Sequence, residues 1–240
     1  MRSDKKRYAL ILASGSGTRA GGGVPKQFRC IGGLPAVCHA VGKFRDSETV
    51  VVLVISGEAF PLWHELESAL PADAPRPDRL VAGGATRRES VTNALAAIPA
   101  DADILVAVHD GARPLLSRSL VERAWQAAGE DAAVVPAVPL ADSIRILKSD
   151  GESEPEDRSR YRAVQTPQIA PAEWLRRAYS LPESPLFTDD ASMLQAAGYP
   201  VRLIEGERRN IKITWPDDFI IAEALIRTTD DNNFCVKHSK

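Results

Sequence analysis

The residues of this chain best suited to chemistry are cations beside a glycine-rich segment near the N-terminus. Residues 13–19 read ASGSGTR, and Lys26 follows Arg19 shortly afterwards. Small residues let backbone N–H groups approach an anion closely, and glycines adopt the φ > 0 turns that such a cradle needs. Because Arg19 and Lys26 add two positive charges, the segment is typical of a polyphosphate site.

The glycine-rich segment matches neither of two common fingerprints. The pattern G-x-x-x-x-G-K-[ST] is absent, and no G-x-G-x-x-G leads into an apolar helix. A P-loop ATPase and a standard dinucleotide-binding protein are therefore disfavoured. A plain surface turn stays open as an alternative at this point, because glycine clusters often mark loops.

Further charged residues recur where predicted helices and strands end. They comprise the cations Arg113, Arg158 and Lys212 and the acids Asp110, Asp142 and Asp189. In an open α/β sheet, polar side chains just beyond the carboxyl ends of strands line the ligand crevice, so Asp110 and Arg113 are expected near the glycine-rich segment. Asp110 is also a candidate Mg²⁺ ligand, since hard divalent cations prefer carboxylate and phosphate oxygens. The alternative is a turn aspartate that caps its own backbone.

These residues do not form the groupings that other common mechanisms need. No nucleophile, base and orienting residue stand together as acyl transfer requires, and no His/Cys spacing resembles a zinc site. We interpret His109, at the end of a predicted strand, as scaffolding. Cations, a glycine-rich segment and one or two carboxylates suit phosphoryl or nucleotidyl transfer, in which the protein mostly positions reactants and neutralises charge.

An alternation of strands and helices would position these residues. Apolar, β-branched runs predict strands at 8–12, 50–55, 79–81, 104–108, 132–137 and 201–204, with a further strand at 210–214. Helices are predicted at 35–44, 60–70 and 171–179, and from Arg87, from a capping box at Ser119, from an N-cap at Thr188 and from Pro216. The order predicts an α/β fold, with a Rossmann-like, mostly parallel sheet sandwiched by helices.

The segment 139–164 departs from this alternation. Two β-prone runs, 143–148 and 158–164, flank an acidic turn at 149–157, which indicates a projecting β-hairpin arm. An isolated hairpin is marginal in water, so we expect it to pack on a second subunit as a dimerisation arm. A solvated flap on a monomer is the alternative.

The composition fits one globular domain over residues 1–240, with a polar, frayed tail at 228–240. Thirty Lys and Arg against 32 Asp and Glu give a net charge of −2, so neither a nucleic acid nor a membrane is an expected partner. Three cysteines lack metal-site spacing and favour free thiols in a reducing cytoplasm. We recognise no signal peptide and no stretch long enough to cross a bilayer.

The chain resembles the 2-C-methyl-D-erythritol 4-phosphate cytidylyltransferase family over residues 9–226. The similar segments, in order, are LASGSGTR with PKQF, GGATRRESV, HDGARP, VQTPQ, TDDASM and NIKIT. The resemblance implies transfer of CMP from CTP to a polyol phosphate, with Mg²⁺ or another divalent cation. Ribitol-5-phosphate cytidylyltransferases share most of these segments, so that acceptor is an alternative, as is another sugar-phosphate nucleotidyltransferase. A rival from a different class is an inactive nucleotide-binding subunit.

The same resemblance assigns expected roles to nucleotide-site residues. Arg19 and Lys26 would stabilise the α-phosphate, and Lys212 would approach the phosphates from the far side. The residues expected to bind the nucleotide are Ala13, Ser14, Gly15, Ser16, Gly17, Thr18, Gly83, Arg87, Ser90, Asp110 and Gly111, of which Gly83, Arg87 and Ser90 would face the cytosine. Ala85 and Thr86 stand where the family often has an acidic residue after Gly83 and Gly84.

For the acceptor, the resemblance implies a site completed across a homodimer interface. The residues expected to bind the polyol phosphate are Arg113, Asp142, Ser143, Arg158 and Thr188. Asp142, Ser143 and Arg158 would reach the neighbouring subunit through the arm.

Overall fold

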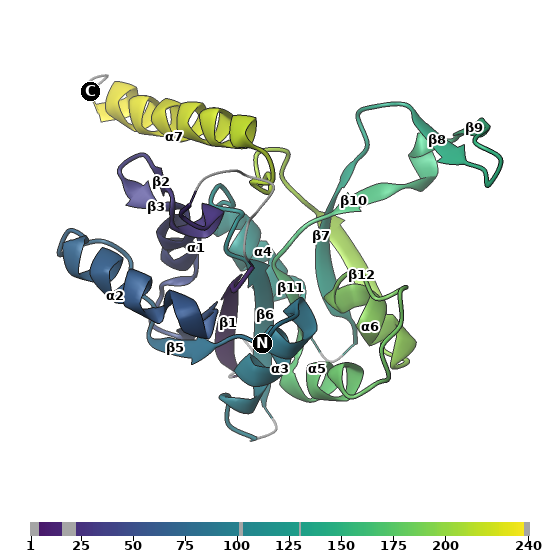
Figure 1. The fold of residues 1–240 in the computed structure, drawn as a ribbon, viewed down its shortest axis with the longest axis horizontal. Helices are drawn as coiled ribbons and strands as arrows, with labels where there is room; N and C mark the ends of the chain where they lie inside the picture. The colour runs from purple at the N-terminus through teal and green to yellow at the C-terminus, as the bar shows by residue number, and fades with distance from the viewer. Residues whose placement is uncertain (1–4, 16–22, 101–102, 130, 238–240) are drawn as a thin grey trace.

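The computed structural model describes residues 5–15, 23–100, 103–129 and 131–237, with side chains described as far as Thr228. Its centre is an eight-stranded sheet, counted over these residues, with the strand order β10-β7-β11-β6-β1-β4-β5 and β12 paired with β7 (Figure 1). The strands are β1 (Lys6–Ala13), β4 (Thr49–Ile55), β5 (Arg79–Ala82), β6 (Ile104–Asp110), β7 (Ala133–Pro139), β10 (Arg162–Val164), β11 (Gln168–Pro171) and β12 (Val201–Glu205).

The middle of the sheet is parallel, as predicted. Strand β1 pairs in parallel with both β4 and β6, and the register sets Leu12 beside Asp110 at their carboxyl ends. These strands are covered on both faces, which is why they read as continuous apolar runs. Strand β11, which is antiparallel to β6 and β7, was not predicted, because the short run QIAP carries no strand signal that stands out.

Helices cover both faces of the sheet, which confirms the predicted sandwich. Packed on one face are α1 (Ala36–Phe44), α2 (Phe60–Ala69) and α4 (Arg118–Ala127), and packed on the other are α3 (Arg87–Ala96), α5 (Ala172–Tyr179) and α6 (Asp190–Ala196). In β1, Ala9 and Ile11 join the first core, and Tyr8 and Leu10 join the second. Successive strand side chains point to opposite faces, so one strand supplies both cores.

The last helix, α7 (Pro216–Lys237), lies outside these two layers. It packs through Ala222 on Ile31, Leu115 and Ile213, a third and smaller core. The helix continues to Lys237, past Thr228, where the sequence predicts a frayed tail. No helix in the described part of the chain is both long and apolar enough to cross a membrane.

Short elements complete the chain. They are the antiparallel pair β2 (Cys30–Ile31) and β3 (Leu34–Pro35) and the 3₁₀ turns η2 (Lys26–Phe28), η3 (Gly57–Ala59) and η4 (Arg158–Arg160).

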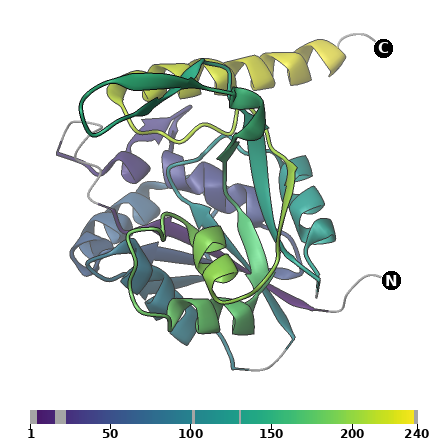
Figure 2. The ribbon, with the colours of Figure 1, turned by 90° about the vertical axis from the view of Figure 1, so that its right-hand side faces the viewer.

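The arm is a hairpin, but its second strand was predicted in the wrong place. Strand β8 (Ile144–Leu147) pairs with β9 (Ser153–Glu156), which lies inside the acidic segment, whereas β10 returns to pair with β7. Gly151, with φ of 89°, closes the turn, and Lys148 pairs with Glu154 across the strands. The two strands are thus joined by an antiparallel ladder, with one exposed ion pair beside the turn. In both views the arm projects at the same end of the molecule as α7 (Figures 1 and 2).

Three smaller expectations were also wrong. Residues 210–214 form an irregular coil instead of a strand. Helix α4 is capped by Ser117, whose hydroxyl accepts from Leu120 N at 2.9 Å, so Ser119 lies inside the helix. Helix α6 is capped by Asp189 rather than Thr188, because Asp189 and Ser192 form a reciprocal capping box.

Candidate functional site

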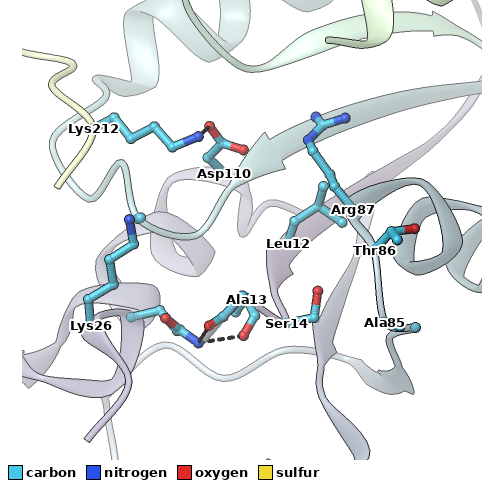
Figure 3. A pocket seen from close by; sticks show the side chains of 13 residues that line it. Leu12, Ala13, Ser14, Lys26, Ala85, Thr86, Arg87, Asp110 and Lys212 are labelled. Carbon is cyan, nitrogen blue, oxygen red and sulfur yellow. Dashed lines mark hydrogen bonds and ion pairs between the residues drawn. The ribbon is translucent and has the colours of Figure 1, made fainter. Parts of the chain in front are cut away.

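A pocket of about 380 Å³ opens at the carboxyl ends of β1 and β6, where an α/β sheet is expected to bind ligands. Figure 3 shows the Lys26 and Lys212 side chains on one side of it and Thr86 and Arg87 on the other. The pocket is lined by Leu12, Ala13, Ser14, Gly15, Lys26, Gln27, Gly84, Ala85, Thr86, Arg87, Asp110, Ala112 and Lys212. Three cations against one carboxylate make this a site for an anion.

The first pocket loop follows β1, and hydrogen bonds from the Gln27 side chain hold it in place. The buried Gln27 amide donates to the carbonyl oxygens of Ala13, at 2.7 Å, and Gly15, at 3.0 Å. These contacts engage two carbonyl oxygens that would otherwise repel an anion. Ser16, Gly17, Thr18 and Arg19, predicted to continue the phosphate cradle, lie outside the described residues.

The second pocket loop leads from β5 into α3 and is held by residues of its own helix. Ala85 N donates to Glu89 Oε2 at 2.7 Å, and Thr86 caps α3 by accepting from Glu89 N at 3.1 Å. Glu89 thus supplies the carboxylate that is absent at positions 85 and 86. Gly83 has no room for a side chain, because a Cβ there would lie 2.7 Å from Ser14 Cβ.

Ser90 joins the two loops and does not line the pocket, and its expected place facing the cytosine stays a prediction. Its hydroxyl is fully buried, 2.8 Å from Ser14 Oγ, and accepts from Gly84 N at 3.1 Å. Ser90 therefore fixes the spacing of the two loops from behind.

Asp110 is an ionised carboxylate surrounded by cations. Lys212 Nζ lies 2.8 Å from Asp110 Oδ2, and Arg113 Nε lies 3.6 Å from the same oxygen. Burial alone would raise the pKa of Asp110, but Lys212 and Arg87 hold the pKa of this carboxyl well below its usual range. Gly111 follows, and its N–H donates to Leu12 O at 2.8 Å, which joins the turn after β6 to the end of β1.

His109 is scaffolding, as the sequence suggested. The ring is fully buried, with Nδ1 3.0 Å from Thr166 Oγ1 and Nε2 3.2 Å from Arg113 O. Burial lowers the pKa of His109 to about 4, so the ring is neutral at neutral pH.

The segment that carries Lys212 is a coil held by other segments. Ile213 N donates to Ala112 O at 2.8 Å, and Lys26 Nζ donates to Ile213 O at 2.7 Å. Asn210 is fully buried, and its amide donates to Thr166 O at 2.9 Å. Tertiary hydrogen bonds replace the strand predicted here, and they bring Lys212 to Asp110.

Arg87 faces the pocket but is anchored behind it. Its NH1 and NH2 lie 2.9 and 2.7 Å from the two carboxylate oxygens of Asp190, and NH1 lies 3.2 Å from the Tyr179 hydroxyl. Burial opposes the charged form, but Asp190 raises the pKa of Arg87 well above its usual value. The guanidinium therefore remains charged at the pocket wall.

The residues predicted to bind the acceptor do not line this pocket. Arg113 is largely buried and donates to Asn210 O at 2.7 Å. Asp142, Ser143 and Arg158 are exposed on the arm, where Arg158 donates to Ala141 O, and Thr188 precedes α6. Among the described residues, the pocket thus contains Ala13, Ser14, Gly15, Arg87 and Asp110 of the nucleotide set. Of the acceptor set, Arg113 pairs with the lining residue Asp110, and none of its members lines the pocket.

Several residues that build the site were not assigned by sequence reasoning. They are Gln27, Glu89, Gln165, Thr166, Asp190 and Asn210, each buried or bonded to a pocket loop. A signal was available, because all six fall in or beside the segments PKQF, GGATRRESV, VQTPQ, TDDASM and NIKIT.

Comparisons with known sequences and with known structures all indicate the same protein family. The sequence profile of 2-C-methyl-D-erythritol 4-phosphate cytidylyltransferase matches residues 8–228. The protein of that name from Porphyromonas gingivalis strain W83 is 42% identical over 224 residues, which are 93% of this chain and 99% of the relative. The one from Bacteroides thetaiotaomicron is 41% identical over 224 residues, covering 92% and 100%. The crystal structure of the Thermus thermophilus protein of the same name superposes with a TM-score of 0.71 and 33% identity, covering 91% of this chain and 98% of that one.

Proposed function

Because this chain belongs to the 2-C-methyl-D-erythritol 4-phosphate cytidylyltransferase family, we infer that it transfers CMP from CTP to the phosphate of 2-C-methyl-D-erythritol 4-phosphate. Pyrophosphate is released, and the product is 4-diphosphocytidyl-2-C-methyl-D-erythritol, an intermediate of non-mevalonate isoprenoid biosynthesis. The observation that carries this function is the pocket lined by Lys26, Arg87 and Lys212 together with the loop that follows β1.

The reaction makes a phosphate oxygen of the acceptor attack the α-phosphorus of CTP, while the bond to pyrophosphate breaks. Both reactants are anionic, and two unit charges about 4 Å apart repel by roughly 4 kcal/mol at an effective dielectric constant near 20. Lys26 and Lys212 offset this repulsion at the pocket. The nucleophile is already an oxyanion, so the reaction needs no general base, and the neutral, buried His109 is not required as one.

We assign Lys26 and Lys212 as catalytic cations, together with Arg19, which lies outside the described residues. Ala13, Ser14 and Gly15 present the loop that receives the triphosphate, and Ala85, Thr86 and Arg87 form the opposite wall for the nucleoside. Phosphoryl chemistry depends mostly on such positioning and charge neutralisation.

Mg²⁺ fits the donor set of this pocket. Asp110 contributes one ionised carboxylate, and Mg²⁺ is usually held by one or two carboxylates together with substrate phosphates. No group of three or more His, Cys, Asp or Glu in the described chain could hold a metal ion without the substrate. When bound with CTP, Mg²⁺ would neutralise phosphate charge, with Asp110 as its protein ligand.

We also propose that the enzyme is a homodimer joined through the arm. The β8–β9 hairpin forms a sheet of its own, with Leu147 79% exposed and Ile146 51% exposed. Burial of these apolar side chains would favour association with a second copy of the chain. Each arm would bring Asp142, Ser143 and Arg158 to the acceptor site of the other copy, which explains why the nucleotide pocket lacks them.

The expected location is the cytoplasm. Cys30, which is exposed, and Cys38, which is buried, are both free thiols, as a reducing compartment allows.

The function is tested by pyrophosphate release from CTP and Mg²⁺ with each of two acceptors. We expect turnover with 2-C-methyl-D-erythritol 4-phosphate to exceed that with ribitol 5-phosphate. Faster turnover with ribitol 5-phosphate would assign the other acceptor, and tight CTP binding without any turnover would indicate a nucleotide-binding subunit.

A further inference from the structure

An ion pair connects the start of α3, beside the nucleotide pocket, with the start of α6, near the expected acceptor residue Thr188. Arg87 is the first residue of α3, and Asp190 is the first residue of α6. The Asp190 side chain is fully buried, whereas that of Arg87 is 35% exposed, toward the pocket. The two helices pack on the same face of the sheet but are about a hundred residues apart in the sequence.

The pair is part of a closed set of hydrogen bonds. Both carboxylate oxygens of Asp190 accept from the Arg87 guanidinium, and the Tyr179 hydroxyl donates to Asp190 while accepting from Arg87. Arg88 NH2 adds a bond of 2.7 Å to Tyr179 O. A planar guanidinium held in this bidentate way has one orientation, so the start of α3 is fixed relative to α5 and α6.

Each residue of the pair directly follows a chain segment that is expected to bind a different substrate. On one side, Ala85 and Thr86 come directly before Arg87 and line the nucleotide pocket. On the other, Thr188, expected at the acceptor, lies two residues before Asp190. Gln168 fixes this second segment to the sheet, because its amide donates to Asp189 Oδ2 at 2.9 Å and accepts from Ala191 N at 2.8 Å.

A buried ion pair is weak evidence for added stability, because desolvation offsets much of its attraction. It is better suited to fixing a geometry, and here the geometry joins two loops that bind different substrates. We propose that Asp190 is a positioning residue that, through Arg87, couples the binding of CTP to the binding of the polyol phosphate. Asp190 touches neither substrate, and this role rests on the proposed function.

The test measures coupling directly, without turnover. The affinity for α,β-methylene CTP with Mg²⁺ is measured by calorimetry, with and without saturating 2-C-methyl-D-erythritol 4-phosphate. In the unmodified protein we expect the bound acceptor to increase the affinity for the analogue about fivefold or more. The bound analogue should increase the affinity for the acceptor by the same factor, which is the coupling factor. In Asp190→Asn we expect the factor to fall to about 1, and Asp190→Glu, which keeps the carboxylate, should recover part of it.

A second variant keeps the proposal testable if Asp190→Asn does not fold. Tyr179→Phe keeps both charges and removes one hydroxyl, so it should fold and still lower the coupling factor. The matched controls are Glu48→Gln, in an ion pair with Arg7 outside the pocket, and Tyr199→Phe, whose ring stacks on Trp174. Both controls should keep the unmodified factor.

The outcomes separate this inference from the proposed function. If the unmodified protein releases pyrophosphate with its acceptor but Asp190→Asn and Tyr179→Phe keep the full coupling factor, the positioning role is wrong. A factor of 1 in an active unmodified protein would also overturn it. Absence of turnover with either acceptor would instead count against the proposed function.

Discussion

Lys26 and Lys212 reach the same pocket from segments far apart in the sequence, and each is oriented by a different partner. Lys26 donates to Ile213 O at 2.7 Å, whereas Lys212 pairs with Asp110 at 2.8 Å. The carbonyl of the Lys212 segment thus orients Lys26. The two ammonium groups therefore depend on the same short coil for their placement.

Lys26→Ala should lower kcat about 100-fold or more, with a smaller change in the KM for CTP. The reason is that this charge stabilises the transition state more than the bound nucleotide. Steady-state kinetics of pyrophosphate release checks this, with Lys6→Ala, at the opposite end of β1, as the matched control. An unchanged kcat would remove Lys26 from the chemistry.

His109 should make the stability of the protein depend on pH. Its pKa is about 4 in the folded protein against 6.5 as the reference value, so the unfolded chain binds more protons between these values. Stability is then fully present above pH 6.5 and falls as the pH decreases toward 4, by roughly 3 kcal/mol. Urea unfolding at several pH values measures this slope. A His109→Gln variant should show a shallower slope in this range, and an equal slope would contradict the assignment.

Among the elements, the coil at 210–214 shows how Lys212, a proposed catalytic residue, can be held without regular structure. Gln165 donates to Glu207 O at 2.7 Å, Asn210 donates to Thr166 O, and Arg113 donates to Asn210 O. Buried side chains thus satisfy backbone groups that a strand would otherwise pair. The coil is fixed by the segment that links β10 to β11.

Asn210→Ala should lower kcat about tenfold or more while the fold is retained. Loss of the amide frees the coil that carries Lys212, and small misplacements of catalytic groups cost large factors in rate. Kinetics together with circular dichroism checks this. Gln126→Ala, on the exposed face of α4, is the control and should leave kcat unchanged. If Asn210→Ala kept full activity, the coil would not need this anchor.

In the molecule as a whole, the arm carries Asp142, Ser143 and Arg158, which we propose bind the acceptor and which do not line the nucleotide pocket of their own chain. Arg158→Ala should therefore raise the KM for the acceptor about tenfold and leave CTP binding nearly unchanged. Titration of each substrate in steady-state assays checks this. Arg160→Ala, in the same 3₁₀ turn, is the matched control. A change confined to CTP binding would contradict the assignment.

Mixed dimers test whether each site is built from two chains. When Lys26→Ala and Arg158→Ala subunits are combined, one of the two sites has an intact Lys26 and receives an intact Arg158 from the other chain. Activity should then recover to a fraction of the unmodified level, although each variant alone is impaired. If activity does not recover after subunit exchange, the shared site is wrong.

Sequence patterns alone were enough to predict the class of fold and several residues that line the pocket. Continuous apolar runs predicted the parallel strands, and the polar residues after 8–12 and 104–108 marked the edge of the sheet where Ser14 and Asp110 line one pocket. Such local patterns suffice because strand burial and strand order leave few ways to build the sheet. The motif segments then singled out Lys26 and Lys212.

How these residues are held follows from the three-dimensional structure. In the folded chain, Ser90 accepts from Gly84 N and lies outside the pocket lining. Glu89 accepts from Ala85 N, and Arg87 donates to Asp190. The structure also has a coil in place of the strand predicted at 210–214 and places β9 within the acidic arm. Hydrogen bonds between residues far apart in the chain decide these features, and hydrophobic periodicity along one segment carries no information about a partner a hundred residues away.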